Sequence, residues 1–415
     1  MTAQALFPSA PGRVADPTAR LQGWRAKLMQ RLFAGREMEV TPAQLQEFVG
    51  YLNQGDPLAD AVIAMYQELP AGEGRKLVDR ALDHGIDTVP EAPPALLGFF
   101  RQIDAVPIWV DRQKLNEGAD VILRTGIFSE LVLRNLSLMG GYLAAAAAKP
   151  LVFTGQLDRM APRRLLETGK FWMDVHRVDG MDRFNEGFKS TVRVRLMHAQ
   201  VRQMLKKSGR WNYAEWGHPI NQGDTMATIL EFSQILLIGL RVLGFRFTRD
   251  EREAVNHLWR YVGYLSGVEE RALPTCEQDA LRALWMQFLT FCPSDEDTRA
   301  LGQALHNVPQ MQAGDDPRKQ FLARLESGYR AGFSRLMLGQ RNGDALGLPK
   351  ARLGTLAVLA TAPVVFSLET LRRNIPGATR AAIKLGRSLN QSGLEMALKA
   401  ENVQANFIPV KTLAR

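Results

Sequence analysis

The chain of 415 residues is short of cysteine, with only Cys276 and Cys292. These two form no C-x-x-C pair and no set of zinc-ligand spacings. Two cysteines cannot stabilise so long a chain through disulfides, so a reducing compartment is expected. The amino terminus also lacks the basic start and long apolar stretch typical of a secretory signal. We therefore predict a cytoplasmic location.

Several enzyme signatures are absent as well. The sequence contains no G-x-x-x-x-G-K-[ST], no G-x-G-x-x-G, no H-E-x-x-H and no G-x-S-x-G. None of the six histidines pairs with another at helical spacing, which argues against a zinc or di-iron site of standard pattern. The common nucleotide-binding, metalloprotease and serine-hydrolase classes are thereby disfavoured.

Positive charge is concentrated at the carboxy-terminal end. The net charge is +9, and residues 371–415 hold eight Lys or Arg against two Glu, a net +6. This tail has a single aromatic residue, Phe407, so it offers no row of stacking platforms for nucleic acid, which we exclude as a partner. An anionic membrane surface and the protein's own acidic face remain as binding partners for the tail.

Within this tail, the segment Ala378–Leu389 favours peripheral membrane association. Ala382 and Leu385 lie on one apolar side of the predicted helix, while Arg380 and Lys384 supply charge. The alternative is that the segment packs on its own domain. A short basic helix could bind either an anionic membrane surface or the protein's own acidic face.

No segment clearly predicts a membrane-spanning helix. The uncharged run Leu353–Leu368 has 16 residues and contains Pro363, whereas a spanning helix needs ~20 apolar residues. The run Asn135–Ala148 is shorter and rich in weakly hydrophobic alanine. We expect both to form buried helices.

Apolar residues recur at spacings of three and four along most of the chain, which predicts an all-α protein. Helix starts are expected at Thr41-Pro42, at the capping box Thr248–Glu251 and at Ser294–Asp297. We predict three parts: an amino-terminal helical extension (1–104), a core (105–340) and carboxy-terminal helices with a basic tail (341–415).

The helical segment 188–205 carries a histidine with an unusual setting. His198 shares its face with Val194 and Val201, and arginines Arg195 and Arg202 flank it. An imidazole on an apolar stripe between two guanidinium groups suits an axial ligand to a haem with two carboxylate tails. Because no C-x-x-C-H occurs, such a haem would be bound without thioether bonds. The alternative is a core histidine bonded to a backbone carbonyl.

A second segment, residues 163–170, adds a polar pair. Arg164 and Thr168 are four residues apart and project from one helix face. A fixed cation and a hydroxyl directed at one point can stabilise negative charge on iron-bound oxygen. The alternative is a helix in which Arg164 pairs with Glu167.

Three blocks then resemble a known family: RRLLETGKFW at 163–172, RVRLMHAQVR at 193–202, and PINQGD at 219–224 followed by Phe232-Ser233. In order and combination they are similar to the latex-clearing proteins, rubber oxygenases that belong with the MpaB-type oxygenases. The resemblance covers roughly residues 105–340. It implies a globin-like helical core around a b-type haem, with His198 as the proximal iron ligand.

The resemblance also implies that Arg164 and Thr168 lie on the distal side, near bound oxygen. Glu167 departs from members that place a lysine at this position. It is a candidate base, with pairing to Lys170 or Arg163 as the alternative. The part Asn221–Asp224 of the third block is expected to cap the helix that it opens, with Asp224 and the amides satisfying free backbone donors; a catalytic role is the alternative.

The expected function is a haem b-dependent oxygenase that cleaves or oxidises C=C bonds of an apolar, isoprenoid substrate with dioxygen. His198 would hold the iron, and its second ring nitrogen would donate to a carbonyl or carboxylate. Arg195 and Arg202 are candidates for binding the haem propionates. Two alternatives remain: a haem-binding sensor or carrier without turnover, and a haem-free helical module that acts at membranes.

Overall fold

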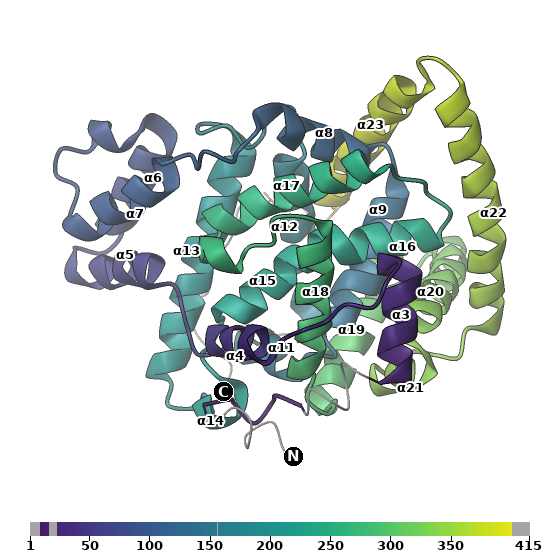
Figure 1. Ribbon diagram of the computed structural model, residues 1–415, viewed down its shortest axis with the longest axis horizontal. Helices are drawn as coiled ribbons and strands as arrows, with labels where there is room; N and C mark the ends of the chain where they lie inside the picture. Colours follow the sequence, from purple (N-terminus) through teal and green to yellow (C-terminus); the bar gives the residue numbers. More distant parts are fainter. Residues whose placement is uncertain (1–8, 16–22, 156, 401–415) are drawn as a thin grey trace.

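The computed structural model describes residues 9–15, 23–155 and 157–400. Within these ranges every regular element is a helix, so the predicted all-α fold is confirmed. The helices pack around a large apolar centre, and two long carboxy-terminal helices form one side of the molecule (Figure 1).

The amino-terminal helices are α3 (Trp24–Ala34), α4 (Pro42–Tyr51), α5 (Pro57–Glu68), α6 (Glu73–His84), η1 (Ile86–Thr88) and α7 (Pro94–Asp104). The next are α8 (Arg112–Leu123), α9 (Ile127–Val132), η2 (Leu133–Leu138), α10 (Met139–Gly141), α11 (Ala145–Phe153), α12 (Leu157–Val175) and α13 (Glu186–Lys207).

The chain continues through α14 (Tyr213–Trp216), α15 (Gln222–Leu230), η3 (Glu231–Ile235), α16 (Leu236–Val242), α17 (Arg249–Leu265), η4 (Glu270–Ala272), α18 (Glu277–Gln287) and η5 (Phe288–Thr290). It ends with α19 (Glu296–Ala313), α20 (Pro317–Leu338), α21 (Gln340–Ala345), α22 (Arg352–Asn374) and α23 (Ala378–Ala400).

Side-chain capping begins several of these helices where the sequence predicts it. Thr41, Thr248 and Asp295 each form a capping box with the residue three positions later. Such caps satisfy backbone N–H groups that have no partner within the helix, and each stabilises its helix by about 1 kcal/mol. The predicted starts are therefore confirmed.

The centre of the molecule is an aromatic cluster between α12, η3 and α17. Trp259 is fully buried and stacks on Phe232 with ring centroids 4.6 Å apart, and Phe171 meets both rings at their edges. Aromatic contacts of this kind add to the free energy of burial. The cluster fixes α12 and α17 around the helix α13, which contacts both.

Helices α5, α6 and α7 form a group at one side of the core (Figure 1, left). Within this group α5 packs against α7, and α5 also packs along α13. The contact with α13 therefore joins the group to the centre of the molecule.

The expectation of two buried apolar helices is half right. In the run Asn135–Ala148, Leu136, Met139 and Leu143 are buried. The run Leu353–Leu368 belongs to α22, of which the most apolar window is only 17% buried. It was wrong to expect a buried helix there, because apolar composition does not specify a neighbour.

By length and composition, two helices of the described part could cross a membrane. One is Gln222–Val242, with 50% of its window buried, and the other is α22. The bent pair Ile127–Gly141 and Ala145–Phe153, with a 99° break, would make a third if it counted as one span.

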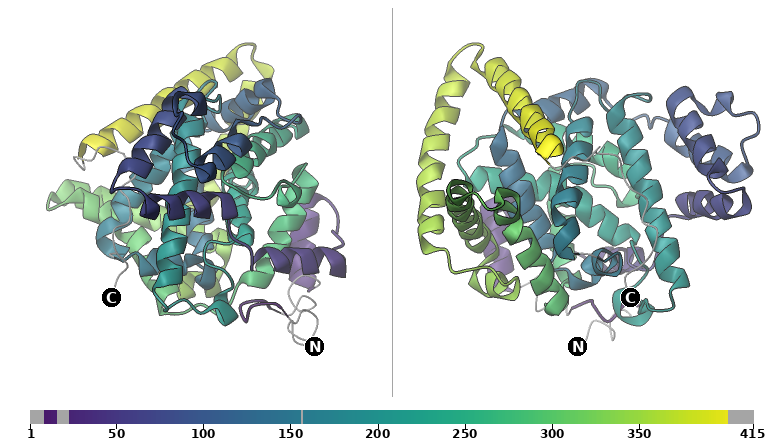
Figure 2. Two further views of the ribbon diagram at one scale, coloured as in Figure 1. Left: turned by 90° about the vertical axis from the view of Figure 1, so that its left-hand side faces the viewer. Right: turned by 180° about the vertical axis from the view of Figure 1, so that it is seen from behind.

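Helix α23 packs on the domain itself, against α8, α9 and α12 (Figure 2). A Cβ at Gly386 would lie 1.9 Å from the carbonyl oxygen of Leu123, so only glycine allows this approach. Arg387 pairs with Asp120 at 3.0 Å. Leu385 nevertheless remains 61% exposed, so membrane binding by this segment stays a prediction.

Candidate functional site

His198 lies in the fourth turn of α13 and is half-buried. Burial lowers the pKa of its imidazole to about 4, the charge of Arg202 lowers it further, and Asp56 acts in the opposite direction. The ring is therefore neutral at pH 7, the form in which imidazole binds a metal. Among the described residues, none forms a hydrogen bond with this ring, so the expected bond to a carbonyl or carboxylate is not found.

A different histidine has the ordinary structural role. The Nδ1–H of His176 donates to the carbonyl oxygen of Trp172 at 2.7 Å, and the ring is fully buried. Burial lowers the pKa of His176 to about 4. The contrast between the two rings is in their bonding: His176 is held by a backbone carbonyl, whereas no described residue holds His198 in this way.

Arg164 projects from α12 toward the end of α11. Its guanidinium donates to the Thr154 hydroxyl at 2.9 Å and to the carbonyl oxygen of Gly155 at 3.3 Å. Burial lowers the pKa of Arg164, and the nearby Tyr142 and Glu167 act in the opposite direction. A cation at a helix carboxyl terminus is stabilised by the helix dipole. Arg164 thus has a structural role that the spacing did not predict.

The other two candidates on α12 have separate surroundings. Thr168 is exposed, and no described residue forms a hydrogen bond with its side chain. Glu167 accepts a hydrogen bond from Nε of Arg163 at 3.1 Å, which is one of the two pairings considered for it. Because α12 packs against α13, the helix that carries Arg164 and Thr168 is a direct neighbour of the helix that carries His198.

Arg195 and Arg202 are engaged with α5. Two nitrogens of Arg195 bind the carboxylate of Asp56 at 2.7 and 3.0 Å, and both side chains are almost fully buried. Nε of Arg202 binds Asp60 at 2.7 Å. Acidic residues of this chain therefore already bind the two guanidinium groups that were predicted to bind haem propionates, which argues against that role.

The predicted capping role at 219–224 is confirmed. The Asn221 side chain accepts from the backbone N–H of Asp224 at 2.8 Å at the start of α15. The carboxylate of Asp224 in turn accepts from Arg13 at 3.0 Å. The amide of Gln222 donates to the carbonyl oxygens of Gly55 and Gly267, both at 2.9 Å. The block thus joins distant loops and stabilises the fold.

The sequence reasoning missed Glu231, the first residue of η3. Its carboxylate lies against Gly141, where a Cβ would stand 2.5 Å from Oε1. Burial raises the pKa of Glu231 to about 8, and Asp224 raises it further. At pH 7 the group is therefore mostly a neutral acid that can donate a hydrogen bond. The available signal was that Glu231 is the single charged residue in the apolar run 226–240.

Glu231 belongs to a group of interior polar side chains. Burial raises the pKa of Tyr142 to about 12, with the charge of Arg164 acting in the opposite direction and Glu231 adding to the rise. Tyr142 thus senses the charges of both Arg164 and Glu231. η2 and η3 are π-helical segments that pack together, and the Ser137 hydroxyl donates to the Glu231 carbonyl oxygen at 2.8 Å. Such segments are frequent at functional sites.

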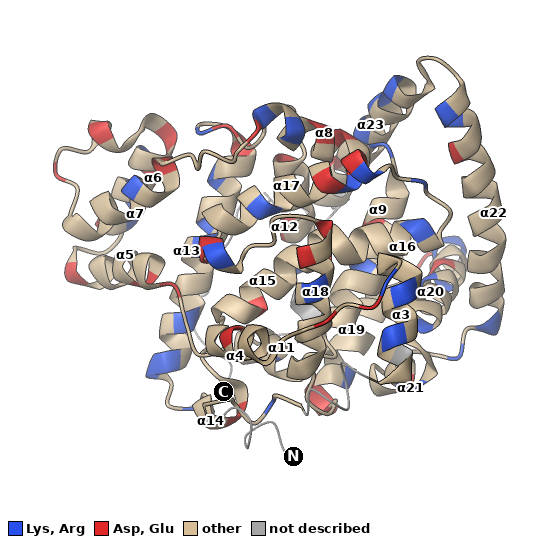
Figure 3. Cartoon of the chain, viewed as in Figure 1, with Lys and Arg blue, Asp and Glu red and all other residues tan. Residues whose placement is uncertain are grey.

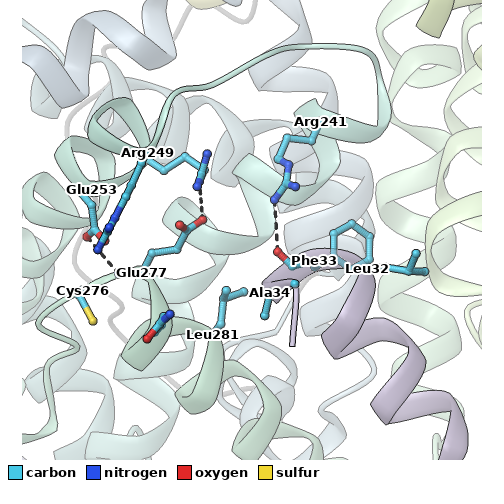
Figure 4. A pocket seen from close by; sticks show the side chains of 12 residues that line it. Leu32, Phe33, Ala34, Arg241, Arg249, Glu253, Cys276, Glu277 and Leu281 are labelled. Atoms are coloured by element: carbon cyan, nitrogen blue, oxygen red, sulfur yellow. Dashed lines mark hydrogen bonds and ion pairs between the residues drawn. The ribbon is translucent and has the colours of Figure 1, made fainter. Parts of the chain in front are cut away.

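A hollow of about 460 Å³ lies elsewhere, between α3, α16, α17 and α18 (Figure 4). Arg252 and Glu277 form an ion pair of 2.6 Å in its wall, and Arg241 donates to the carbonyl oxygen of Phe33 at 3.4 Å. None of the predicted site residues lines it. Its charged wall residues Arg252 and Glu277 are paired with each other, so we assign this hollow no catalytic role.

The family described as "ER-bound oxygenase mpaB/B'/Rubber oxygenase, catalytic domain" matches residues 129–366, more than half of the chain. The chain belongs to this family. The predicted resemblance is thereby confirmed, and α12 and α13 with Arg164, Thr168 and His198 lie inside the matched region.

Two individual proteins are similar to this member of the family. The rubber oxygenase of Streptomyces sp. (strain K30) is 24% identical over 280 residues, which are 66% of this chain and 63% of that protein. The aligned part thus spans less than two thirds of the relative's length. The structure of latex clearing protein LCP in the closed state matches with a TM-score of 0.61 and 21% identity, over 86% of this chain and 93% of that chain.

The buried pair between Arg195 and Asp56 predicts a large stability effect. Asp56→Asn keeps an oxygen that can cap α5 but leaves the guanidinium without its countercharge. We expect the free energy of unfolding to fall by about 3–5 kcal/mol, measured by chemical denaturation. Asp79→Asn, at an exposed ion pair with Arg75, is the control and should cost at most about 1 kcal/mol. Equal effects of the two substitutions would contradict this assignment.

Glu231 predicts a pH-dependent stability. Its folded-state pKa of about 8 lies above the ordinary 4.5, so its favourable contribution is complete below pH 4.5 and is lost as pH rises to about 8. Glu231→Gln should therefore raise the melting temperature relative to the parent more at pH 8 than at pH 5. The exposed Glu68→Gln should give no such difference. A pH-independent effect of Glu231→Gln would show that the carboxyl titrates normally.

Proposed function

We propose that this chain is a haem b-dependent oxygenase that oxidises or cleaves C=C bonds of an apolar, isoprenoid substrate with dioxygen. The observation that carries the proposal is His198, a neutral imidazole on a central helix whose ring no described residue binds. Membership in an oxygenase family supports the reaction class. The printed name of the relative, rubber oxygenase, supports an isoprenoid substrate.

The chemistry of His198 and of its apolar neighbour on α13 suits a haem. The imidazole of His198 would hold the iron through a ring nitrogen that needs no deprotonation at pH 7. Val194 lies one turn before it and packs against the main apolar core, which suits a flat apolar ligand. Within the described residues, no group of three or more His, Cys, Asp or Glu could hold a metal ion, so a multi-ligand protein site does not compete with this proposal there.

The overall reaction is balanced with dioxygen as the oxidant. Both oxygen atoms add to one C=C bond, the bond breaks, and two carbonyl groups result without an external electron donor. Bound haem supplies the iron that activates dioxygen. The polypeptide would hold the iron through His198, next to the buried core that includes Trp259 and on which Val194 packs, and would present polar groups from the neighbouring helix α12.

Of these polar groups, Arg164 is already oriented. Its bonds to Thr154 and Gly155 fix the guanidinium at the end of α11. A fixed cation costs little reorganisation when negative charge develops nearby. Thr168 lies one turn further along α12 with a hydroxyl that no described residue engages. We propose that these two side chains stabilise charge on the reacting oxygen.

Haem occupancy should depend on His198. His198→Ala should lower the haem-to-protein ratio of purified protein and shift or abolish the Soret band, because alanine has no group that can bind the iron. His306→Ala, at another half-buried histidine, is the control and should leave both unchanged. Parent-like occupancy and spectrum in His198→Ala would disprove the ligand role. A parent protein without a Soret band would reject haem binding altogether.

Substitution of Thr168 should affect turnover alone, whereas substitution of Arg164 should affect both turnover and stability. Thr168→Val should keep the haem and the melting temperature but lose ~10²-fold in oxygen consumption with an isoprenoid substrate. Arg164→Ala should lose activity and also about 1–3 kcal/mol of stability, because it removes charged hydrogen bonds from the end of α11. Full activity in both variants would exclude the electrostatic role.

A further inference from the structure

Helix α22 is the outermost long helix of the molecule (Figures 1 and 2). Its free side is apolar. The side chain of Leu353 is 82% exposed, that of Leu356 60% and that of Leu359 52%. Further along the same helix the exposed apolar residues are Val364, Phe366, Leu368 and Leu371. A contiguous apolar face of this length on a monomer usually marks an interaction surface.

The distribution of apolar and charged side chains on α22 is the reverse of that usual for a helix on the surface of a water-soluble protein. Between Leu353 and Leu371 the single charged residue is Glu369, and it points inward with 5% exposure. Its carboxylate binds Nε of Arg372 at 2.7 Å and lies 3.7 Å from Arg124 of α8. The leucines therefore face outward while the charge is buried.

The inner face of α22 is fixed too closely on α20 to allow rotation. A Cβ at Gly354 would lie 1.9 Å from the carbonyl oxygen of Gly328, and one at Gly332 would lie 2.3 Å from the backbone of Gly354. The hydroxyl of Tyr329 donates to Thr361 at 3.1 Å. The outward direction of the leucines is thus set by backbone contact and hydrogen bonding.

Positive charge surrounds this apolar face. Residues 345–394 hold seven Lys or Arg and one acid, Glu369, a net +6. The exposed basic residues of this stretch are Lys350, Arg352, Arg373, Arg380 and Lys384. Figure 3 shows blue toward both ends of α22 and almost none between them. The exposed Asp344 just before this stretch is paired with Arg335. An apolar strip with basic ends matches the surface of an anionic bilayer.

We propose that the outer face of α22 binds in the plane of an anionic lipid bilayer, with its leucines among the acyl chains and the basic residues at the headgroups. A spanning arrangement is disfavoured because α20, which covers the inner face, carries the ion pair Arg330–Glu326. A second copy is disfavoured because two such faces would bring basic ends together. The surface differs from the segment 378–389 predicted from the sequence, which packs on the domain.

The test is co-sedimentation of the full chain with phosphatidylcholine vesicles, with and without phosphatidylserine. The parent should bind only the anionic vesicles, and high salt should release it. Leu356→Ser with Leu359→Ser should reduce the vesicle-bound fraction about tenfold or more, because both side chains would leave the acyl layer. Arg352→Gln with Arg373→Gln should weaken binding at low salt.

Matched control variants distinguish binding through this face from non-specific binding to vesicles. Leu28→Ser with Leu32→Ser removes two exposed leucines from α3, and Arg75→Gln with Lys76→Gln removes two charges from α6; both should bind like the parent. Parent-like binding of the Leu356/Leu359 variant, or no binding by the parent, would overturn the proposal. So would a lipid-independent dimer that this variant disrupts, or binding that resists alkaline carbonate. None of these readouts needs haem or turnover.

Discussion

The placement of the candidate ligand depends on a buried ion pair on the flank of its helix. Arg195 binds Asp56 through two nitrogens, and its remaining terminal nitrogen reaches Gln102 at 2.6 Å. Removing two charges from water is costly, and only such complete pairing offsets the cost. Gly267 is required as well, since a Cβ there would lie 2.5 Å from Nε of Arg195. The pair fixes the rotation of α13, and hence the direction in which His198 points.

The same pair shows what residue spacing can and cannot reveal. Spacing along α13 correctly places Arg195, His198 and Arg202 on neighbouring faces, because helix geometry is local. The partner of Arg195 lies 139 positions away in the chain, and nothing local distinguishes the carboxylate of an aspartate from that of a propionate. For Glu231 a local signal did exist, since a lone carboxylate in an apolar run must be buried, neutralised or paired.

The helical structure and several helix ends could be predicted because they depend on residues close together in the chain. Thr248 and Glu251 cap α17 through contacts within one turn, so four residues contain the whole interaction. The burial of α22 could not be predicted, because an apolar run specifies that water is avoided without specifying what replaces it. In the structure α20 covers one face through Gly328 and Gly332, and the opposite face remains open. The predicted cytoplasmic location and the division of the chain into three parts stay predictions.

The carboxy-terminal helices also connect the exposed surface with the candidate site. α23 contacts α22 at one end and α12 further along, and its Leu394 would lie 3.7 Å from a Cβ at Gly169, the neighbour of Thr168. A solid or membrane-dissolved hydrocarbon is poorly soluble in water, so an enzyme that oxidises it gains from meeting it at an apolar interface. If α22 rests on a bilayer, α23 is the element between that bilayer and α12. The exposed leucines of α22 and the candidate residues of α12 are then two ends of one structural unit, joined by a helix whose close packing on Leu123 depends on Gly386.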